Sequence, residues 1–148
     1  MREHAGGGLA LVPTAPEVPR NRDSLYPYRH DSYFYYLSGF PEPEAVVALV
    51  AGPDGPGSDR HVLFCREKNE EREIWDGFRY GPEAAREIFG FDEAHPISEL
   101  KTTLPDLARE VLPHQVLHHD EGGALGGVHV VDARDVLVLD AGGRASFA

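Results

Sequence analysis

The side chains best suited to binding a metal crowd one short stretch near the end of the chain. Imidazoles and carboxylates gather there as His114, His118, His119, Asp120, Glu121 and His129. If residues 115–119 form a strand, His118 and His119 point to opposite faces and cannot chelate one ion together. His114 shares a face with His118, but four strand rises (about 13 Å) separate them. A zinc site could still form from His118 or His119 with His129 across a sheet, while surface imidazoles that bind no metal are the simpler interpretation.

Two other features allow chemistry but favour plain structural roles. Cys65 is the only cysteine and follows an apolar run, which favours a buried, inert thiol over a nucleophile. Gly6, Gly7 and Gly8 form a triplet, but no Gly-Lys-Ser or Gly-Lys-Thr follows it, so a phosphate-binding loop is not indicated. The triplet is most simply a flexible entry to the first strand.

Length and charge restrict the class of protein. A chain of 148 residues fits one domain with a single core. Its formal net charge of -11 argues against non-specific binding to nucleic acid or anionic membranes, which requires clustered lysines and arginines. The apolar run at residues 9–12 is too short for a signal peptide or a membrane span. We therefore expect no nucleic-acid or membrane partner. A lone cysteine cannot form an internal disulfide, which indicates a cytoplasmic protein.

Alternating strands and helices are predicted along the chain, which favours an α/β layered domain. Apolar runs predict strands at residues 9–12, 44–51, 61–65, 115–118, 128–131 and 136–140. Residues 61–65 should pair with residues 44–51 as a hairpin with an irregular turn. Helices are expected at residues 33–37, 83–89 and 98–112, the last kinked or divided at Pro105. The charged residues 66–73 are most simply a solvated connection.

The most distinctive stretch is residues 26–47, which holds five of the six tyrosines. Such a dense aromatic cluster must pack against the protein or touch a partner. Asp31 or Ser32 can cap a short helix there, and Gly39 can end it. Phe34 points away from the face that three other side chains of this helix share: Tyr33, Tyr36 and Leu37. We favour an ordinary aromatic core for most of these rings.

Three motifs follow one another in a distinctive order and spacing. The first is Tyr-Pro-Tyr-Arg at residues 26–29, and the second is Gly-Phe-Pro-Glu-Pro-Glu-Ala at residues 39–45. The third is Glu-Ile-Trp-Asp-Gly-Phe-Arg-Tyr-Gly at residues 73–81. Together they resemble the signature of the N-terminal domain of Xaa-Pro aminopeptidases (aminopeptidase P), in the creatinase and prolidase group. Each motif alone is weak, but in this order they indicate the family over roughly residues 8–121.

The resemblance implies an α/β, creatinase N-terminal-domain-like mixed sheet flanked by helices over residues 1–123. In full-length family members this domain precedes a pita-bread domain, where two Asp, one His and two Glu hold a pair of divalent metals, usually Mn²⁺. A bridging hydroxide there attacks the peptide bond before proline. The domain in front of it would be non-catalytic and would serve oligomerisation and substrate gating.

Residues 124–148 are expected to be a short strand-forming tail that resembles a remnant of that catalytic domain. The string Arg-Asp-Val-Leu-Val-Leu-Asp-Ala-Gly at residues 134–142 resembles the family strand that delivers the first metal-binding Asp, which would be Asp140. One carboxylate cannot hold a hard divalent cation tightly. We therefore expect a truncated chain with a vestigial ligand and no cofactor, and an ordinary strand-end Asp in a turn is the alternative.

The third motif contains Trp75, the first candidate for a gating role. In oligomeric family members a similar tryptophan can reach the mouth of a neighbouring subunit's active site, where a flat indole suits a prolyl ring. A partly buried core indole is the alternative. Arg79 could orient that loop or meet a substrate carboxylate, or it could form a surface salt bridge with a nearby Glu. Arg29, in the first motif, could be either a structural anchor or a residue of the substrate gate.

Two rival functions stay open. The chain could join a separately encoded catalytic metallopeptidase chain and so complete a manganese-dependent Xaa-Pro peptidase. It could instead be a stand-alone protein-binding module, because relatives that have lost catalysis bind other proteins and an acidic surface suits basic partners. Self-association or a catalytic metallopeptidase chain is the partnership that we expect, and the chain alone should be inactive.

Overall fold

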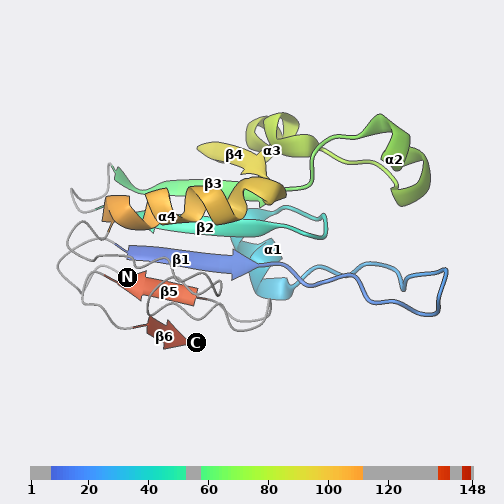
Figure 1. Ribbon diagram of the computed structural model, residues 1–148, viewed down its shortest axis with the longest axis horizontal. Helices are drawn as coiled ribbons and strands as arrows, with labels where there is room; N and C mark the ends of the chain where they lie inside the picture. The colour runs from blue at the N-terminus through green and yellow to red at the C-terminus, as the bar shows by residue number, and fades with distance from the viewer. Residues whose placement is uncertain (1–7, 53–57, 112–136, 141–144, 148) are drawn as a thin grey trace.

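The computed structural model describes residues 8–52, 58–111, 137–140 and 145–147, which form a mixed sheet with helices on both faces (Figure 1). The strands are β1 (Gly8–Pro13), β2 (Val46–Ala51), β3 (Arg60–Cys65), β4 (Glu93–Pro96), β5 (Leu137–Asp140) and β6 (Ala145–Phe147). The helices are α1 (Ser32–Ser38), α2 (Glu70–Asp76), α3 (Gly81–Phe89) and α4 (Leu100–Val111), with a 3-10 turn η2 (Ile97–Glu99) before α4. The strand order is β4-β3-β2-β1-β5-β6, in which β3 and β4 are parallel and the other neighbours antiparallel. The expected mixed sheet flanked by helices is confirmed.

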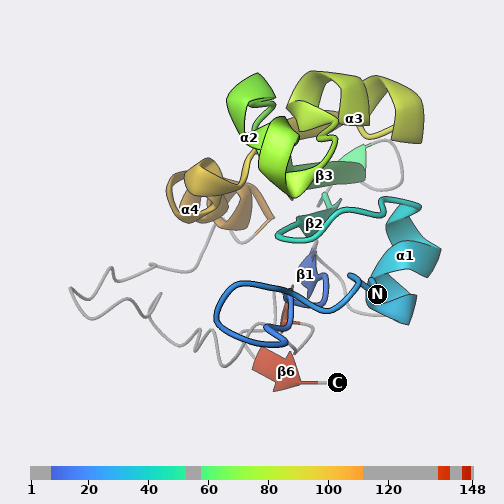
Figure 2. The same cartoon turned by 90° about the vertical axis from the view of Figure 1, so that its right-hand side faces the viewer.

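Alternate residues of the central strands face opposite sides of the sheet, and each side carries its own hydrophobic cluster. Figure 2 shows α4 on one side of the sheet and α1 and α3 on the other. The cluster on the α4 side contains Leu9, Leu11, Ala48, Val50, Val62, Phe64, Leu104, Leu107, Ala108 and Val111. The cluster on the side of α1 and α3 contains Val12, Phe34, Phe40, Ala45, Val47, Leu63, Cys65, Ala85 and Phe91. All six residues of β2 are apolar, as expected of a strand that is covered on both faces.

Local signals determine both ends of α1 and the end of α3. The Asp31 carboxylate accepts hydrogen bonds from the backbone N–H groups of Tyr33 and Phe34, both at 2.9 Å. These bonds satisfy two donors that a helix N-terminus leaves unpaired. Gly39 and Gly90 end α1 and α3 in the left-handed conformation, with φ of 67° and 74°, which glycine adopts without steric cost.

Several sequence predictions are confirmed. The predicted strands at residues 9–12, 44–51 and 61–65 are β1, β2 and β3, and β2 pairs with β3 antiparallel as expected. The helix predicted at residues 83–89 is α3, and the last predicted strand is β5. The short strand β4 and the final strand β6 were not predicted.

Two predictions about helices need correction. Residues 66–73 are more than a solvated connection, because α2 begins within them at Glu70. Pro105 does not divide the last predicted helix, because α4 is continuous from Leu100 to Val111, and the alternative of a kink stays a prediction. The buried face of α4 packs on the sheet, and this packing outweighs the hydrogen bond that proline cannot donate.

The aromatic side chains of α1 confirm one prediction and contradict another. Phe34 points away from the face that Tyr33, Tyr36 and Leu37 share, as expected, and it is fully buried in the second cluster. Tyr33, Tyr36 and Leu37 are exposed, with Tyr36 at 87%, so the prediction that most of these rings belong to the core is wrong. The short helix therefore meets the sheet through Phe34, and its shared tyrosine face points away from the core.

The end of the chain adds strands to the same sheet. β5 pairs with β1, with Asp140 opposite Gly8, and β6 pairs with β5. The strands predicted at residues 115–118 and 128–131, the histidine-rich stretch and the expected boundary after residue 123 lie outside the described residues. Within the part of the chain that is described, no helix has the length and apolar character that crossing a membrane requires.

Candidate functional site

Between β3 and α3 the chain leaves the sheet as an arm, residues 66–80, which carries α2 away from the body of the molecule (Figure 1). Three large apolar side chains are exposed on this arm: Ile74 at 78%, Trp75 at 87% and Phe78 at 61%. We call these three residues the apolar tip. Trp75 therefore lies on the surface, and the alternative of a partly buried core indole is wrong. Large apolar side chains that gather on a surface commonly mark a site of contact with another molecule.

α2 has clear local signals at both ends. Asn69 caps it, because its Oδ1 atom accepts a hydrogen bond from the Arg72 N–H at 3.0 Å. Acidic residues occupy the first turn, where the helix dipole favours negative charge. Gly77, with φ of 83°, ends the helix and donates its N–H to the Glu73 carbonyl at 3.1 Å. Trp75 is consequently carried on the last turn of a helix.

A buried charged pair lies where the arm leaves and rejoins the domain. Glu42, in the turn before β2, and Arg66, directly after β3, are both more than nine-tenths buried. Arg66 Nη2 lies 3.9 Å from Glu42 Oε2, and Glu42 Oε1 accepts the Tyr80 N–H at 2.8 Å. Because Arg66 begins the arm and Tyr80 ends it, one carboxylate joins both ends.

Burial has the largest effect on the pKa values of Glu42 and Cys65, which lie where the arm joins the domain. It raises the pKa of Glu42, and the opposing effects of the Tyr80 N–H and of the Arg66 and Arg79 charges are smaller. Burial, with a smaller contribution from Glu42, also raises the pKa of Cys65 to about 12. The Cys65 thiol thus stays protonated at neutral pH and is a poor nucleophile. The prediction that Cys65 is buried is confirmed, and its lack of reactivity stays a prediction.

Arg79 lies on the limb of the arm that returns to α3. Its backbone N–H donates to Glu73 Oε1 at 3.3 Å, and its carbonyl accepts a hydrogen bond from Lys68 Nζ at 3.4 Å. Its side chain is partly buried. The backbone of Arg79 is therefore tied to the two other segments of the arm.

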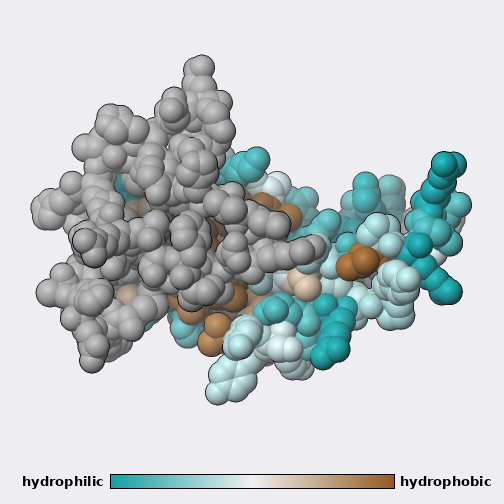
Figure 3. Space-filling model, turned by 90° about the horizontal axis from the view of Figure 1, so that it is seen from below, coloured by the Kyte–Doolittle hydropathy of each residue, from teal (hydrophilic) through white to brown (hydrophobic). Residues whose placement is uncertain are grey.

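Arg29 lies on a different segment, the loop of residues 14–31 between β1 and α1. This loop projects at the same end of the molecule as the arm (Figure 1), and in Figure 3 it is mostly hydrophilic with a small hydrophobic spot. The hydroxyl groups of Thr14 and Tyr28 share a hydrogen bond of 2.6 Å at its base. Arg29 itself is exposed, so it belongs to this loop and not to the arm.

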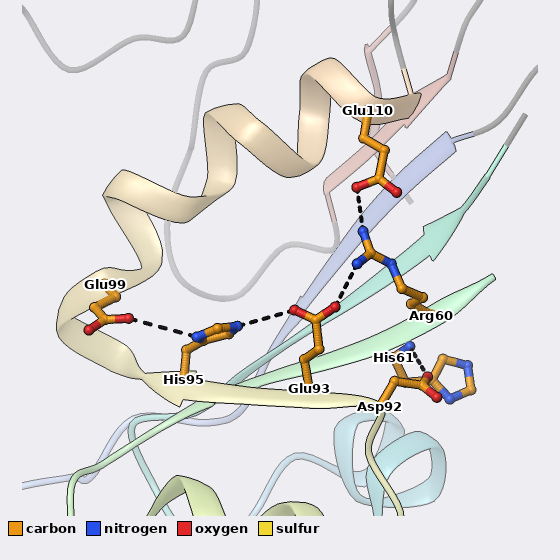
Figure 4. A network of polar contacts seen from close by, with 7 residues as sticks. All are labelled: Arg60, His61, Asp92, Glu93, His95, Glu99 and Glu110. Atoms are coloured by element: carbon orange, nitrogen blue, oxygen red, sulfur yellow. Dashed lines mark hydrogen bonds and ion pairs between the residues drawn. The ribbon is translucent and has the colours of Figure 1, made fainter. Parts of the chain in front are cut away.

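A second polar network joins β3, β4 and α4 (Figure 4). Arg60 donates to Glu93 at 2.5 Å and also to Glu110. His95 Nε2 lies 3.3 Å from Glu93, and His95 Nδ1 lies 3.7 Å from Glu99. Because the two ring nitrogens face different carboxylates, this arrangement cannot direct both carboxylates and one imidazole nitrogen to a single metal ion. The network instead connects neighbouring elements.

The residues that the structure describes do not fit a pair of divalent metals. Among them, no three His, Cys, Asp or Glu residues gather closely enough to hold a metal ion. Asp140, the predicted ligand, ends β5 beside Gly8 of β1. One carboxylate is too few for a hard cation, so the role of Asp140 as a vestigial ligand stays a prediction.

Sequence reasoning found Trp75 but missed its two apolar neighbours. Ile74 and Phe78 are large apolar residues in a stretch rich in charged ones. Asn69, as a cap before several acidic residues, was an available signal for α2. The contacts of Glu42 with both ends of the arm had no comparable signal, because they join residues far apart in the sequence.

Comparisons with known proteins agree on one family. The model of the family described as aminopeptidase P, N-terminal domain, matches residues 1–115. An Xaa-Pro aminopeptidase of Escherichia coli is 42% identical over 116 residues, which cover 78% of this chain and 25% of that protein. An Xaa-Pro aminopeptidase of Haemophilus influenzae is 34% identical over 123 residues, covering 82% of this chain and 28% of that protein. The chain thus spans about a quarter of the length of these relatives.

Solved structures give the same result. The aminopeptidase PepP of Pseudomonas aeruginosa matches with a TM-score of 0.61 and 49% identity, over 67% of this chain and 22% of that one. Aminopeptidase P from Escherichia coli with the inhibitor Pro-Leu matches with a TM-score of 0.64 and 42% identity, over 70% of this chain and 23% of that one.

Proposed function

The chain belongs to the aminopeptidase P N-terminal domain family, and from this membership we propose that it is the non-catalytic domain through which an Xaa-Pro aminopeptidase-type metallopeptidase oligomerises and gates its substrate. Its partner is a second copy of this chain or a catalytic metallopeptidase chain. The observation that carries the proposal is the apolar tip, exposed at the end of an arm that leaves the sheet.

The apolar tip is better suited to an intermolecular contact than to the fold of this domain. Both faces of the central strands are already covered, by α4 on one side and by α1 and α3 on the other. Trp75 contributes a large, flat surface, and Ile74 and Phe78 extend it. Burying such side chains against another protein surface is favourable by about 25 cal/mol for each Å² of apolar area. Aromatic residues of this kind commonly dominate the binding energy of interfaces.

Each candidate residue receives a role in this proposal. Trp75 packs against a prolyl ring at the active-site mouth of the partner. Arg79, held through its backbone, keeps the return limb of the arm in place and meets a substrate carboxylate. Arg29 acts at the gate from the neighbouring loop. Asp140 is a vestigial metal ligand at the end of β5.

The hydrolytic chemistry belongs to a separate catalytic region. In the full-length family, Mn²⁺ would supply a metal-bound nucleophile, but the described residues of this chain do not fit that pair of ions. The protonated Cys65 thiol also argues against covalent catalysis at that position. A single cysteine supports placing the domain in the cytoplasm.

Sedimentation velocity over a range of protein concentrations tests the contact made by the tip. Trp75→Ser removes the largest apolar side chain of the tip, and Tyr36→Ser is a matched control because Tyr36 and Trp75 are both 87% exposed. We expect the unmodified chain and Tyr36→Ser to associate as the concentration rises. Trp75→Ser should stay monomeric, because the centre of the contact has lost its aromatic surface.

Two results would contradict the proposal. A chain that stays monomeric, both alone and when mixed with an Xaa-Pro aminopeptidase catalytic domain, would exclude a role in assembly. Association that Trp75→Ser leaves intact would place the contact away from the tip. If the chain instead binds basic proteins and added salt weakens that binding, the stand-alone binding module is the correct function.

A further inference from the structure

Lys68 lies on the outgoing limb of the arm, residues 66–69, which leads from β3 to α2. It contacts both α2 and the return limb, residues 77–80, which leads to α3. Lys68 Nζ lies 3.4 Å from Glu73 Oε1 on α2 and donates to the Arg79 carbonyl on the return limb, also at 3.4 Å. The same ammonium lies 4.8 Å from the centre of the Phe78 ring. Lys68 therefore contacts α2 and the return limb on either side of the turn that carries Trp75.

The first residue of α3, directly after the return limb, also lies close to the backbone of Lys68. Gly81, with φ of 73°, lies so near that a Cβ atom there would be 2.9 Å from Lys68 Cβ and 3.2 Å from Lys68 N. A side chain at this position would meet both unfavourable backbone geometry and a steric conflict. The outgoing limb is thus in contact with the start of α3 as well as with the return limb.

Glu73 completes the closure of the arm. Its Oε1 atom faces the Lys68 ammonium and also accepts the Arg79 N–H at 3.3 Å. The Glu73 side chain is 19% exposed and that of Lys68 is 49% exposed, so the carboxylate is the better shielded partner. Charged hydrogen bonds are stronger when partly shielded from water.

α2 needs such support because it has only seven residues. A helix this short is not stable in water by itself. Its direction, and with it the direction of the Trp75 indole, must therefore be determined by contacts with the rest of the arm. Lys68 supplies contacts to both limbs and to an aromatic ring of the tip.

We propose that Lys68 and Glu73 form an electrostatic latch that closes the arm and holds Trp75 in one orientation. This inference rests on the proposed function, in which Trp75 makes the intermolecular contact. Lys68 is a positioning residue, because it acts through Trp75. A fixed indole loses less conformational entropy on binding than a mobile one, so the latch favours association with the partner.

The latch should affect the arm much more than the global fold. A partly exposed ion pair contributes little to global stability, and neither Lys68 nor Glu73 belongs to a hydrophobic cluster. Local opening of a loop has a much smaller free energy than global unfolding, so the same contacts weigh more there. We expect loss of the latch to raise the open population of the arm by about three- to tenfold.

Time-resolved fluorescence anisotropy measures the motion of the arm directly, because Trp75 is the only tryptophan. The test variant is Lys68→Met, which keeps most of the side-chain length without the charge. Lys101→Met is the matched control, since Lys101 is the only other lysine and lies exposed on α4. Measurements on dilute, monomeric chain should show a larger amplitude of fast local motion in Lys68→Met. The amplitude in Lys101→Met should equal that of the unmodified chain.

Salt provides a second readout of the same contact. The Debye length falls from about 10 Å at 0.1 M salt to about 3 Å at 1 M, which screens a partly exposed pair. Raising NaCl to about 1 M should therefore increase the fast amplitude in the unmodified chain and in Lys101→Met. Lys68→Met, which has no pair to screen, should show no such increase.

Glu73→Gln keeps an acceptor for the Arg79 N–H but removes the charge, so it should also increase the fast amplitude. Unchanged Trp75 motion in Lys68→Met or in Glu73→Gln would overturn the latch. A fall in the urea unfolding midpoint as large as that caused by a core substitution would also overturn it, because Lys68 would then support the whole domain. Failure of the proposed function appears separately, as a lack of Trp75-dependent association in sedimentation.

Discussion

Phe34 and Tyr36 lie two residues apart on α1, and we expect alanine at these positions to change the free energy of unfolding very differently. Phe34 is fully buried in the cluster beneath α1 and α3, so Phe34→Ala leaves a cavity and should cost about 3–5 kcal/mol. Tyr36 is 87% exposed, so Tyr36→Ala should change stability by less than about 0.5 kcal/mol. Replacing Phe or Tyr by Ala also raises the helix propensity, which stabilises both variants by a similar amount of about 0.5 kcal/mol. The difference between the variants therefore isolates burial.

Urea unfolding followed by circular dichroism gives both free energies, and equal slopes against urea show that the same surface is exposed in each variant. If Phe34→Ala does not fold, Phe34→Leu provides a smaller cavity at the same site. Equal effects at the two positions, or a larger effect at Tyr36, would show that α1 packs through its tyrosine face. That result would refute the core described here.

Three further predictions concern Cys65, Glu42 and metal. Burial raises the pKa of Cys65 to about 12, so a disulfide reagent at pH 8 should leave the folded chain unmodified. The same reagent should react fully with the chain unfolded in urea. Rapid reaction of the folded protein would contradict the buried thiol. Burial raises the folded pKa of Glu42 above its ordinary 4.5, so its contribution to stability is complete below that value and is lost as pH rises through the folded pKa. The unfolding free energy of the unmodified chain minus that of Glu42→Gln should therefore fall as pH rises through this window, by at most about 1.4 kcal/mol per pH unit for one proton. A rise would mean that attraction to Arg66 outweighs burial. With Mn²⁺ and an Xaa-Pro peptide, the chain alone should release no N-terminal residue, and turnover that a chelator abolishes would contradict the non-catalytic proposal.

The central part of the fold could be predicted from local patterns. The apolar runs of β1, β2 and β3 identify strands covered on both faces, and Asp31 and Gly39 mark the two ends of α1. These signals act over a few residues, so a single sequence displays them clearly. The family motifs also contain Trp75 and Arg79, which lie on the arm.

Features that depend on distant contacts could not be predicted in the same way. Phe34 and not Tyr36 became the buried ring of α1, because the side chain that faces the sheet is decided by how the helix docks. Pro105 remained within α4 because packing on the sheet outweighs its local preference. The bonds that Glu42 makes to Tyr80 and Arg66 join residues more than twenty positions apart.

Acrylamide quenching of Trp75 fluorescence over a range of chain concentrations most directly tests whether the apolar tip is a contact surface. In dilute solution the indole should be quenched almost as readily as free tryptophan, because it is 87% exposed. As the chains associate, the quenching constant should fall, because the partner covers the indole. Association with no change in the quenching constant, or an indole already shielded in dilute solution, would contradict the account.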